Sequence, residues 1–285
     1  MTAASDIAAL PPLRDVIREH GLRAEKSLGQ NFLLDLNLTG KIARTAKSLQ
    51  GATVFEIGPG PGGLTRALLE GGAAKLIAIE YDPRAIEALQ SLKAAAAGRL
   101  EIIQADALHR DLPTLAAEHG LKPPFVIVAN LPYNIATPLL TGWLEQIYAD
   151  PALYTELVLM FQKEVAQRIV GKPSSKAYGR LSILTQWLCE AKLAFDVPAS
   201  AFTPPPKVTS SIVRLVPKKK VDADFSVMEK LTAAAFGQRR KMIRGSLKNY
   251  IPYIEACGLR PEARAEELSV EDFAALAKAV TKDPL

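Results

Sequence analysis

The sequence predicts an α/β protein in which helices cover a parallel sheet, followed by a smaller region made only of helices. Up to about residue 216, short apolar runs alternate with amphipathic stretches, which is typical of a parallel sheet. Beyond Pro217 a run of three lysines forms a linker, and the chain continues mostly as amphipathic helix. We therefore expect a sheet domain with an N-terminal helical extension at residues 1–220 and a helical domain at residues 221–285.

The expected elements follow in chain order. Two helices precede the sheet, at residues 13–20 and 36–49. Apolar runs predict five strands and an outer pair, at residues 53–57, 75–80, 100–104, 125–129, 157–161, 191–197 and 208–216. Helices are expected between these strands at residues 64–69, 83–97 and 163–170, and after them at residues 226–236, 241–250 and 270–280. The run from Ser269 to Asp272 resembles a capping box at the start of the last helix.

Composition limits the class of protein. The chain has 285 residues, of which 48% are hydrophobic and 23% are charged, so a folded protein is expected rather than disorder. Its two cysteines, Cys189 and Cys257, match neither a disulfide framework nor a zinc site, and the three histidines show no metal-ligand spacing. No apolar run approaches the roughly 18 to 20 residues of a membrane span. We expect a soluble, cytoplasmic protein without a metal and without a membrane partner.

Positive charge is concentrated in one segment. Residues 207–248 contain eleven Lys or Arg and three acidic residues, a net charge of +8, whereas the whole chain carries +5. Such a segment fits a polyanion such as nucleic acid, and it equally fits a basic surface that only contacts water. Charge alone leaves both interpretations open.

A glycine-rich turn follows the first predicted strand. Gly58, Gly60 and Gly63 satisfy the G-x-G-x-x-G pattern of a dinucleotide site, where glycine allows close approach of the backbone to a ligand. Pro59 and Pro61 remove two of the N–H groups that would receive a pyrophosphate. The turn by itself leaves a dinucleotide dehydrogenase and an S-adenosylmethionine enzyme open.

Carboxylates at the ends of three successive predicted strands favour S-adenosylmethionine. Glu56 adds a negative charge that suits a ligand with an ammonium and a sulfonium group and disfavours a diphosphate. Glu80 can accept hydrogen bonds from both ribose hydroxyls, although a dehydrogenase uses the same contact. Asp106 can accept from the adenine amino group, and Ala107 leaves room for a flat ring. One such acid is readily explained as a helix cap or a solvated turn, but three in succession favour a binding site.

The motif Asn130-Leu131-Pro132-Tyr133 follows the fourth predicted strand and indicates the chemistry. An adenine amino group is a poor nucleophile because its lone pair is delocalised into the ring. The Asn130 side-chain oxygen and the Leu131 carbonyl can accept both amino hydrogens, which frees the lone pair to attack a methyl group. Pro132 fixes the turn, and Tyr133 offers a face on which an extruded base can stack. The alternative is a polar strand end with a proline turn.

With these motifs, the chain resembles the rRNA adenine dimethyltransferase family from about residue 23 to at least residue 247. The resemblance implies a Rossmann-like S-adenosylmethionine-dependent methyltransferase sheet, with an antiparallel last strand and a small C-terminal all-helical domain. Residues 26–33, Lys-Ser-Leu-Gly-Gln-Asn-Phe-Leu, resemble the family's N-terminal signature, in which Gln30, Asn31 and Leu33 would contact the methionine part of the cofactor.

Three further segments resemble functional parts of the family. Residues 202–208 resemble its second base-contacting loop, where Phe202 would stack on the target adenine; from the residues alone, a Phe202 packed in the core is favoured. Residues 171–179 resemble a mobile loop near the substrate entrance. The helical domain would hold RNA through four cations, Arg239, Arg240, Lys241 and Arg244. If this segment is helical, Met242 and Ile243 can face inward.

The resemblance implies methyl transfer from S-adenosylmethionine to N6 of two adjacent adenosines near the 3′ end of 16S rRNA, within the pre-30S ribosomal subunit. A monomer and a late checkpoint in ribosome biogenesis are expected. The alternatives are an antibiotic-resistance enzyme acting on large-subunit rRNA, and an assembly factor acting mainly by binding. A DNA adenine methyltransferase usually has proline where Leu131 stands, and nothing resembles the hydride-transfer residues of a dehydrogenase.

Overall fold

The computed structural model describes residues 7–22, 30–219, 221–238 and 240–282. The first half of the predicted signature (residues 26–29), one lysine of the predicted linker (Lys220) and one predicted RNA-binding residue (Arg239) lie outside these ranges.

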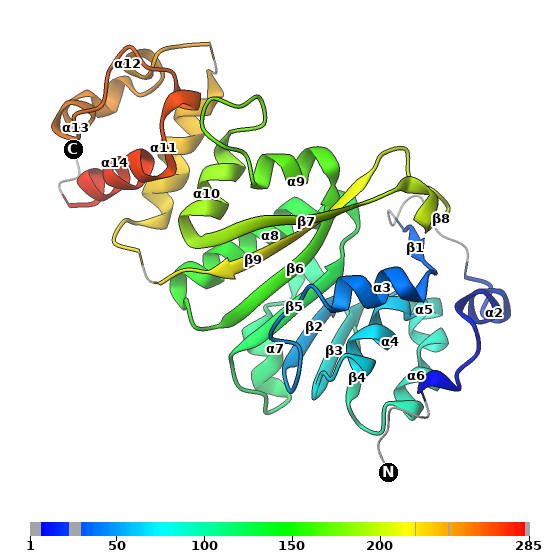
Figure 1. The fold of residues 1–285 in the computed structure, drawn as a ribbon. Helices are drawn as coiled ribbons and strands as arrows, with labels where there is room; N and C mark the ends of the chain where they lie inside the picture. The colour runs from blue at the N-terminus through cyan, green and yellow to red at the C-terminus, as the bar shows by residue number, and fades with distance from the viewer. Residues whose placement is uncertain (1–6, 23–29, 220, 239, 283–285) are drawn as a thin grey trace.

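A seven-stranded sheet forms the centre of the molecule, with strand order β4-β3-β2-β5-β6-β9-β7 (Figure 1). Its strands are β2 (Thr53–Ile57), β3 (Lys75–Glu80), β4 (Leu100–Gln104), β5 (Phe125–Asn130), β6 (Tyr154–Gln162), β7 (Cys189–Val197) and β9 (Ser210–Pro217). The pairs among β2 to β6 are parallel, and β9 pairs antiparallel with both β6 and β7. The predicted α/β class and the antiparallel strand are both confirmed.

Helices cover both faces of this sheet because the strands bury side chains on both sides. Val54 packs with Ile42 and Leu68 in one buried cluster, whereas its neighbour Phe55 packs with Leu140 in another. The helices are α2 (Leu13–Glu19), α3 (Leu36–Ala43), α4 (Gly63–Glu70), α5 (Pro83–Ala88), α6 (Gln90–Ala95), α7 (Leu112–Glu118), α8 (Tyr133–Ala149), α9 (Lys163–Ile169) and α10 (Arg180–Leu188).

Several helices differ from the prediction. The helix expected at residues 36–49 ends at Ala43, and the helix expected at residues 83–97 divides at Leu89, which is fully buried. Helices α7, α8 and α10 were not predicted from the sequence. The longest of these, α8, contains Pro138 in its interior, and a proline there ordinarily indicates a helix end.

The C-terminal helices α11 (Phe225–Gly237), α12 (Ile243–Ser246), α13 (Ile251–Ala256) and α14 (Val270–Lys282) gather beside α10 (Figure 1). The predicted capping box of α14 is confirmed: the backbone N–H of Ser269 donates to Asp272 Oδ2 at 2.8 Å, and that of Asp272 donates to Ser269 Oγ at 3.0 Å.

The helix predicted at residues 241–250 is wrong. Lys241 lies in a bend, Met242 forms a bridge with Arg264 and is 41% exposed, and only residues 243–246 form α12. The backbone N–H groups of Ile243 and Arg244 donate across to residues 263 and 261 rather than within a longer helix, at 2.8 and 3.0 Å. Pairing with a distant segment therefore replaces the local helical pattern, although Ile243 is buried as expected.

One apolar cluster runs from the sheet into the C-terminal helices. The ring of Phe225 lies 6.2 Å from that of Trp187 and 5.5 Å from that of Tyr148. Tyr178, at the end of the loop at residues 171–179, is 1% exposed and packs edge-on against Phe236. The loop that resembles a mobile entrance loop is thus packed against α11, and the division into two domains near residue 220 stays a prediction.

Candidate cofactor pocket and active site

A pocket lies at the edge of the sheet where β2, β3 and β5 end. Parallel α/β sheets ordinarily bind ligands at this edge, because the loops after the strands converge there. The structure brings every predicted cofactor-binding residue to this pocket: Gln30, Asn31, Leu33, Glu56, Gly58, Gly60, Glu80, Asp106, Ala107 and Asn130. Leu131, Pro132 and Tyr133 of the motif line it as well.

The glycine turn leaves space for a segment from far away in the sequence. Gly58 and Gly60 have φ values of +65° and +53°, which side chains rarely adopt. A Cβ on Gly60 would lie 3.1 Å from the ring of Phe32, and a Cβ on Gly63 would lie 2.6 Å from the carbonyl oxygen of Leu33. Gly60 and Gly63 therefore serve close packing against the N-terminal segment.

That segment, residues 30–33, is here called the strap, and three contacts hold it at the pocket. Gln30 Nε2 donates to Asp82 Oδ2 at 3.1 Å, and Asn130 Nδ2 donates to the carbonyl oxygen of Asn31 at 3.3 Å. Strand β1 (Phe32–Leu33) pairs antiparallel with β8 (Phe202–Thr203). The strap thereby joins the end of β3, the end of β5 and the β8 segment.

Asp82 was not among the site residues predicted from the sequence. Its side chain is 3% exposed, caps α5 through the N–H of Arg84, and forms an ion pair with the Arg84 guanidinium at 2.7 Å. The hydrogen bonds from Arg84 hold the pKa of this carboxyl below its usual range. The Asp-Pro start of α5 was a usable signal for a cap. No local pattern indicated that the same carboxylate also holds Gln30.

Glu80 is fixed at the pocket wall by backbone donors. Its Oε1 accepts from the N–H groups of Tyr81 and Asp82 at 2.8 and 2.9 Å, and its Oε2 accepts from that of Gly60 at 3.1 Å. Burial raises the pKa of this carboxyl, while these three hydrogen bonds oppose the rise. The bonds give the carboxylate one orientation, as a group that recognises a ligand requires.

Glu56 is the group that best tests whether the pocket fits S-adenosylmethionine. It is 1% exposed, and its Oε2 has no hydrogen-bond partner among the described residues. Its pKa is raised to about 8, chiefly by burial and less by the nearby charge of Glu80, while the Thr65 hydroxyl opposes the rise. A buried carboxyl group with one unpaired oxygen suits a cationic ligand, which stabilises its charged form. The pocket fits a ligand that carries ammonium and sulfonium groups.

Asp106 and two large side chains form another part of the wall. Asp106 caps a short 3-10 helix, accepting from the Leu108 N–H at 2.9 Å. It therefore has the role of a helix cap, which was the alternative interpretation, and it also lines the pocket. Tyr81 and Leu108, which also line the pocket, are 62% and 43% exposed. Such exposure of large side chains at a concave site is typical of a wall that a bound ligand covers. Neither residue was among those predicted from the sequence.

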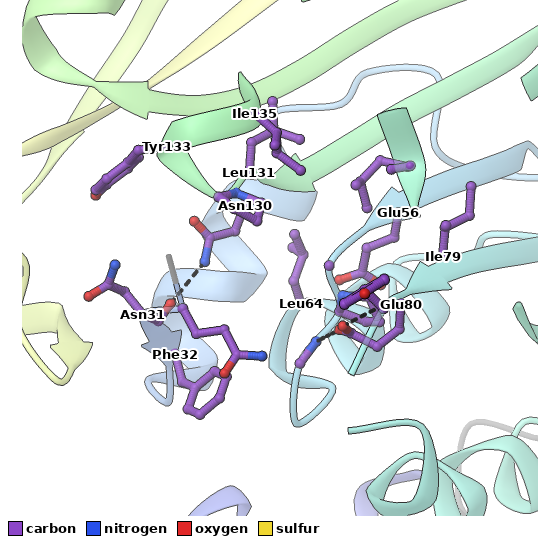
Figure 2. A pocket seen from close by; sticks show the side chains of 18 of the residues that line it. Asn31, Phe32, Glu56, Leu64, Ile79, Glu80, Asn130, Leu131, Tyr133 and Ile135 are labelled. Atoms are coloured by element: carbon purple, nitrogen blue, oxygen red, sulfur yellow. Dashed lines mark hydrogen bonds between the residues drawn. The ribbon is translucent and has the colours of Figure 1, made fainter. Parts of the chain in front are cut away.

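The four-residue motif joins β5 to α8. Asn130 ends β5, Leu131 is 2% exposed, and Tyr133 begins α8 after Pro132. Because the Asn130 amide nitrogen donates to Asn31, its Oδ1 remains as the acceptor at the pocket (Figure 2). The Tyr133 hydroxyl lies 2.5 Å from Ser210 Oγ, and burial raises the pKa of that phenol.

Two sets of predicted residues lie away from the pocket. Phe202 is 3% exposed and packs with Leu33 and Ile212 in the core, so the structure does not bring it to the pocket as the resemblance implied. The core position favoured by the residues alone is the one observed. Arg240, Lys241 and Arg244 are exposed, and Arg244 lies 3.9 Å from Glu262.

Within the described ranges, no group of three His, Cys, Asp or Glu side chains is placed to hold a metal ion. None of the helices in the same ranges has the length and apolar character needed to cross a membrane.

A family model for ribosomal RNA adenine dimethylases matches residues 21–282. The chain belongs to this family. It is similar to the ribosomal RNA small subunit methyltransferase A of Ruegeria sp. (strain TM1040), with 55% identity over 98% of this chain and 99% of the relative. The enzyme of the same name from Xanthobacter autotrophicus is 56% identical over 97% of this chain and 95% of its own.

Solved structures agree with this assignment. A dimethyladenosine transferase from Plasmodium falciparum superposes with a TM-score of 0.71 and 28% identity, over 87% of this chain and 96% of its own. The 23S rRNA methyltransferase ErmE shares the fold, with a TM-score of 0.67 and 24% identity over 87% of this chain and 99% of its own. Family membership makes the chain an S-adenosylmethionine-dependent enzyme that dimethylates adenine in ribosomal RNA.

Proposed function

We propose that this enzyme methylates N6 of two adjacent adenosines near the 3′ end of 16S rRNA, twice at each nucleotide, within the pre-30S ribosomal subunit. Its relatives at 55–56% identity span nearly the whole chain and carry the name of a small-subunit enzyme. The structure of the large-subunit enzyme is 24% identical, so the antibiotic-resistance alternative is not favoured.

The observation that carries the proposed chemistry is the orientation of the Asn130 amide. Its nitrogen is bonded to Asn31, so Oδ1 is the atom available to accept an amino hydrogen at the pocket. The Leu131 carbonyl would accept the second hydrogen, and the Tyr133 ring would hold the base. The nitrogen lone pair is thereby freed without a general base, because the proton is lost only after the methyl group has been transferred.

The cofactor would supply an electrophilic methyl group to this site. The strap residues Gln30, Asn31 and Leu33 would hold its methionine part, with Glu56 as the counter-charge. Glu80 would bind the ribose, and Asp106 with Ala107 would bind the adenine. Support for this arrangement comes from the common pocket, the fixed Glu80 carboxylate and the unpaired Glu56 oxygen.

The direct test is methyl transfer from labelled S-adenosylmethionine to immature small subunits that lack the modification. Naked rRNA, large subunits and duplex DNA are incubated in parallel, and each product is digested to nucleosides. We expect N6,N6-dimethyladenosine with small subunits alone. Label in large subunits instead would restore the antibiotic-resistance alternative, and label in duplex DNA would restore the DNA methyltransferase.

Asn130→Ala tests the role of the amide. We expect the rate of transfer to fall by about 100- to 1,000-fold, the usual effect of removing one preorganised hydrogen-bond partner of a reacting group. Cofactor affinity, measured by calorimetry, should fall less than the rate does, because Gln30 and the pairing of β1 with β8 still hold the strap. Asn37→Ala removes an exposed amide on α3 and serves as the matched control. Full activity of the Asn130 variant would remove this residue from the mechanism.

We also infer that the enzyme acts as a monomer in the cytoplasm and that its binding marks a late stage of small-subunit assembly. The basic segment around Arg240 and Lys241 supports binding to a large RNA particle. Asn130→Ala separates the two roles, since it would bind precursor subunits without methylating them. Normal subunit maturation in cells that carry only this variant would favour assembly by binding as the main role.

A further inference from the structure

The hydroxyl groups of Tyr133 and Ser210 share a hydrogen bond of 2.5 Å across 77 residues of sequence. Tyr133 lines the pocket and is partly buried, whereas Ser210 is fully buried at the start of β9 and lies outside the pocket lining. The tyrosine ring is therefore held at both ends, by the start of α8 at its Cα and by Ser210 at its hydroxyl.

Ser210 is itself a rigid anchor. It pairs with Gln162 of β6 on one side and with Val197 of β7 on the other. The residue before it is also held, because the carbonyl oxygen of Thr209 accepts from the Lys163 N–H at 2.9 Å. A group supported in this way keeps the same position during a reaction, as a residue that orients another must.

We infer that Ser210 is a positioning residue that fixes the Tyr133 ring as a platform for the target base, and that this platform matters more in the second methyl transfer than in the first. The inference rests on the proposed function, because it concerns two successive transfers to one adenosine. Ser210 itself is not expected to touch the substrate.

The difference between the two transfers follows from the number of hydrogen-bond donors on N6. The amino group of adenosine has two N–H bonds, which can engage Asn130 Oδ1 and the Leu131 carbonyl together. After one transfer, a methyl group has replaced one hydrogen, so only one N–H bond remains. The monomethylated base is held by one hydrogen bond fewer and depends more on stacking against Tyr133.

The test compares product ratios of Ser210→Ala, Tyr133→Phe and the double variant with the unmodified chain. Each variant removes the same hydrogen bond and keeps the aromatic face. Ser211→Ala is the matched control, because Ser211 is equally buried but its hydroxyl donates to Asp196 Oδ1 at 2.6 Å, away from the pocket. Immature small subunits are methylated over a time course and digested, and N6-methyladenosine and N6,N6-dimethyladenosine are quantified.

We expect the second transfer to slow by about fivefold in both single variants, the effect of one hydrogen bond of ordinary strength, so that N6-methyladenosine accumulates. The double variant should match the single variants, and Ser211→Ala should match the unmodified chain. A purely structural loss would slow both transfers equally and leave the product ratio unchanged.

Three outcomes count against the inference, and they are distinguishable. An unchanged product ratio in the variants, with full dimethylation by the unmodified chain, would overturn the role of Ser210 alone; so would a double variant whose effect is the product of the single effects. Absence of dimethyladenosine with the unmodified chain would overturn the proposed function, and the inference with it.

Discussion

At the scale of single residues, the protonation state of Glu56 should depend on whether a cationic ligand is bound in the pocket. Its carboxyl group is 1% exposed, lacks a partner for one oxygen, and has a pKa raised by burial from 4.5 to about 8. A folded pKa above the unfolded value stabilises the free protein fully below pH 4.5, and this contribution is lost as the pH rises through about 8. A cationic ligand reverses the preference, because it favours the ionised carboxylate.

Binding of S-adenosylmethionine at pH 7 is therefore expected to release up to one proton from Glu56, and the affinity should weaken as the pH falls below about 8. Calorimetry in buffers of different ionisation enthalpy measures the released protons. Glu56→Gln should release none from this site. Equal release by the variant and the unmodified chain would assign the proton to another group.

At the residue scale, the sequence predicted which strand-end residues would come together at one pocket. Glu56, Glu80, Asp106 and Asn130 each lie at or just after the end of a parallel strand, and such ends meet at one edge, so their convergence was predictable. The contact of Ser210 with Tyr133 could not be predicted, because it joins residues 77 positions apart and no local sequence pattern indicates it.

At the scale of elements, the strap depends on the close approach of β1 to the start of α4. A Cβ on Gly63 would lie 2.6 Å from the Leu33 carbonyl and 3.0 Å from the Leu13 side chain. The carbonyl belongs to the backbone of β1 and cannot rotate away. Any side chain at Gly63 would therefore displace the strap from the pocket.

Gly63→Ala is expected to destabilise the protein by about 1–3 kcal/mol, as overpacking ordinarily does, and to weaken cofactor binding. The matched control is Gly142→Ala in α8, where a Cβ would meet nothing within 4 Å. That change should stabilise the protein by about 0.5–1 kcal/mol, because alanine favours a helix interior over glycine. Denaturant unfolding and calorimetry measure the two effects; similar results for both variants would contradict the close-packing argument.

Strands were easier to predict than helices because a strand buried on both faces is a continuous apolar run. The predicted limits of β2, β3 and β4 agree with the structure. Helix α8 was not predicted because it contains Pro138. The helix expected at residues 241–250 does not form as predicted, because Met242 pairs with Arg264 instead. These features depend on tertiary contacts, which a local pattern does not contain.

At the scale of the whole molecule, charge and core are distributed differently along the chain. The basic segment at residues 207–248 carries a net charge of +8, so the remaining residues carry a small net negative charge. Association with RNA should therefore depend on this segment more than on the rest of the surface. The buried core, by contrast, is not divided between the basic segment and the rest of the chain, because one apolar cluster includes residues of both.

Replacing Arg240, Lys241 and Arg244 with glutamine is expected to weaken RNA binding and to flatten its salt dependence. Each lost phosphate contact should reduce the slope of log affinity against log salt by about 0.7 to 0.9. Lys47 and Lys122, exposed cations on other parts of the molecule, provide a control pair whose replacement should leave the slope unchanged. A slope unaffected by the triple variant would place the RNA surface elsewhere.

The shared core also affects how the chain is made. Phe273 and Leu276 of α14 belong to the same buried cluster as Phe55 and Ile127 of the sheet. A nascent chain that has emerged only as far as β9 therefore contains every strand of the sheet but lacks α11 and α14, which pack against α10. Chains terminated before residue 270 are therefore expected to leave apolar surface exposed to chaperones and proteases.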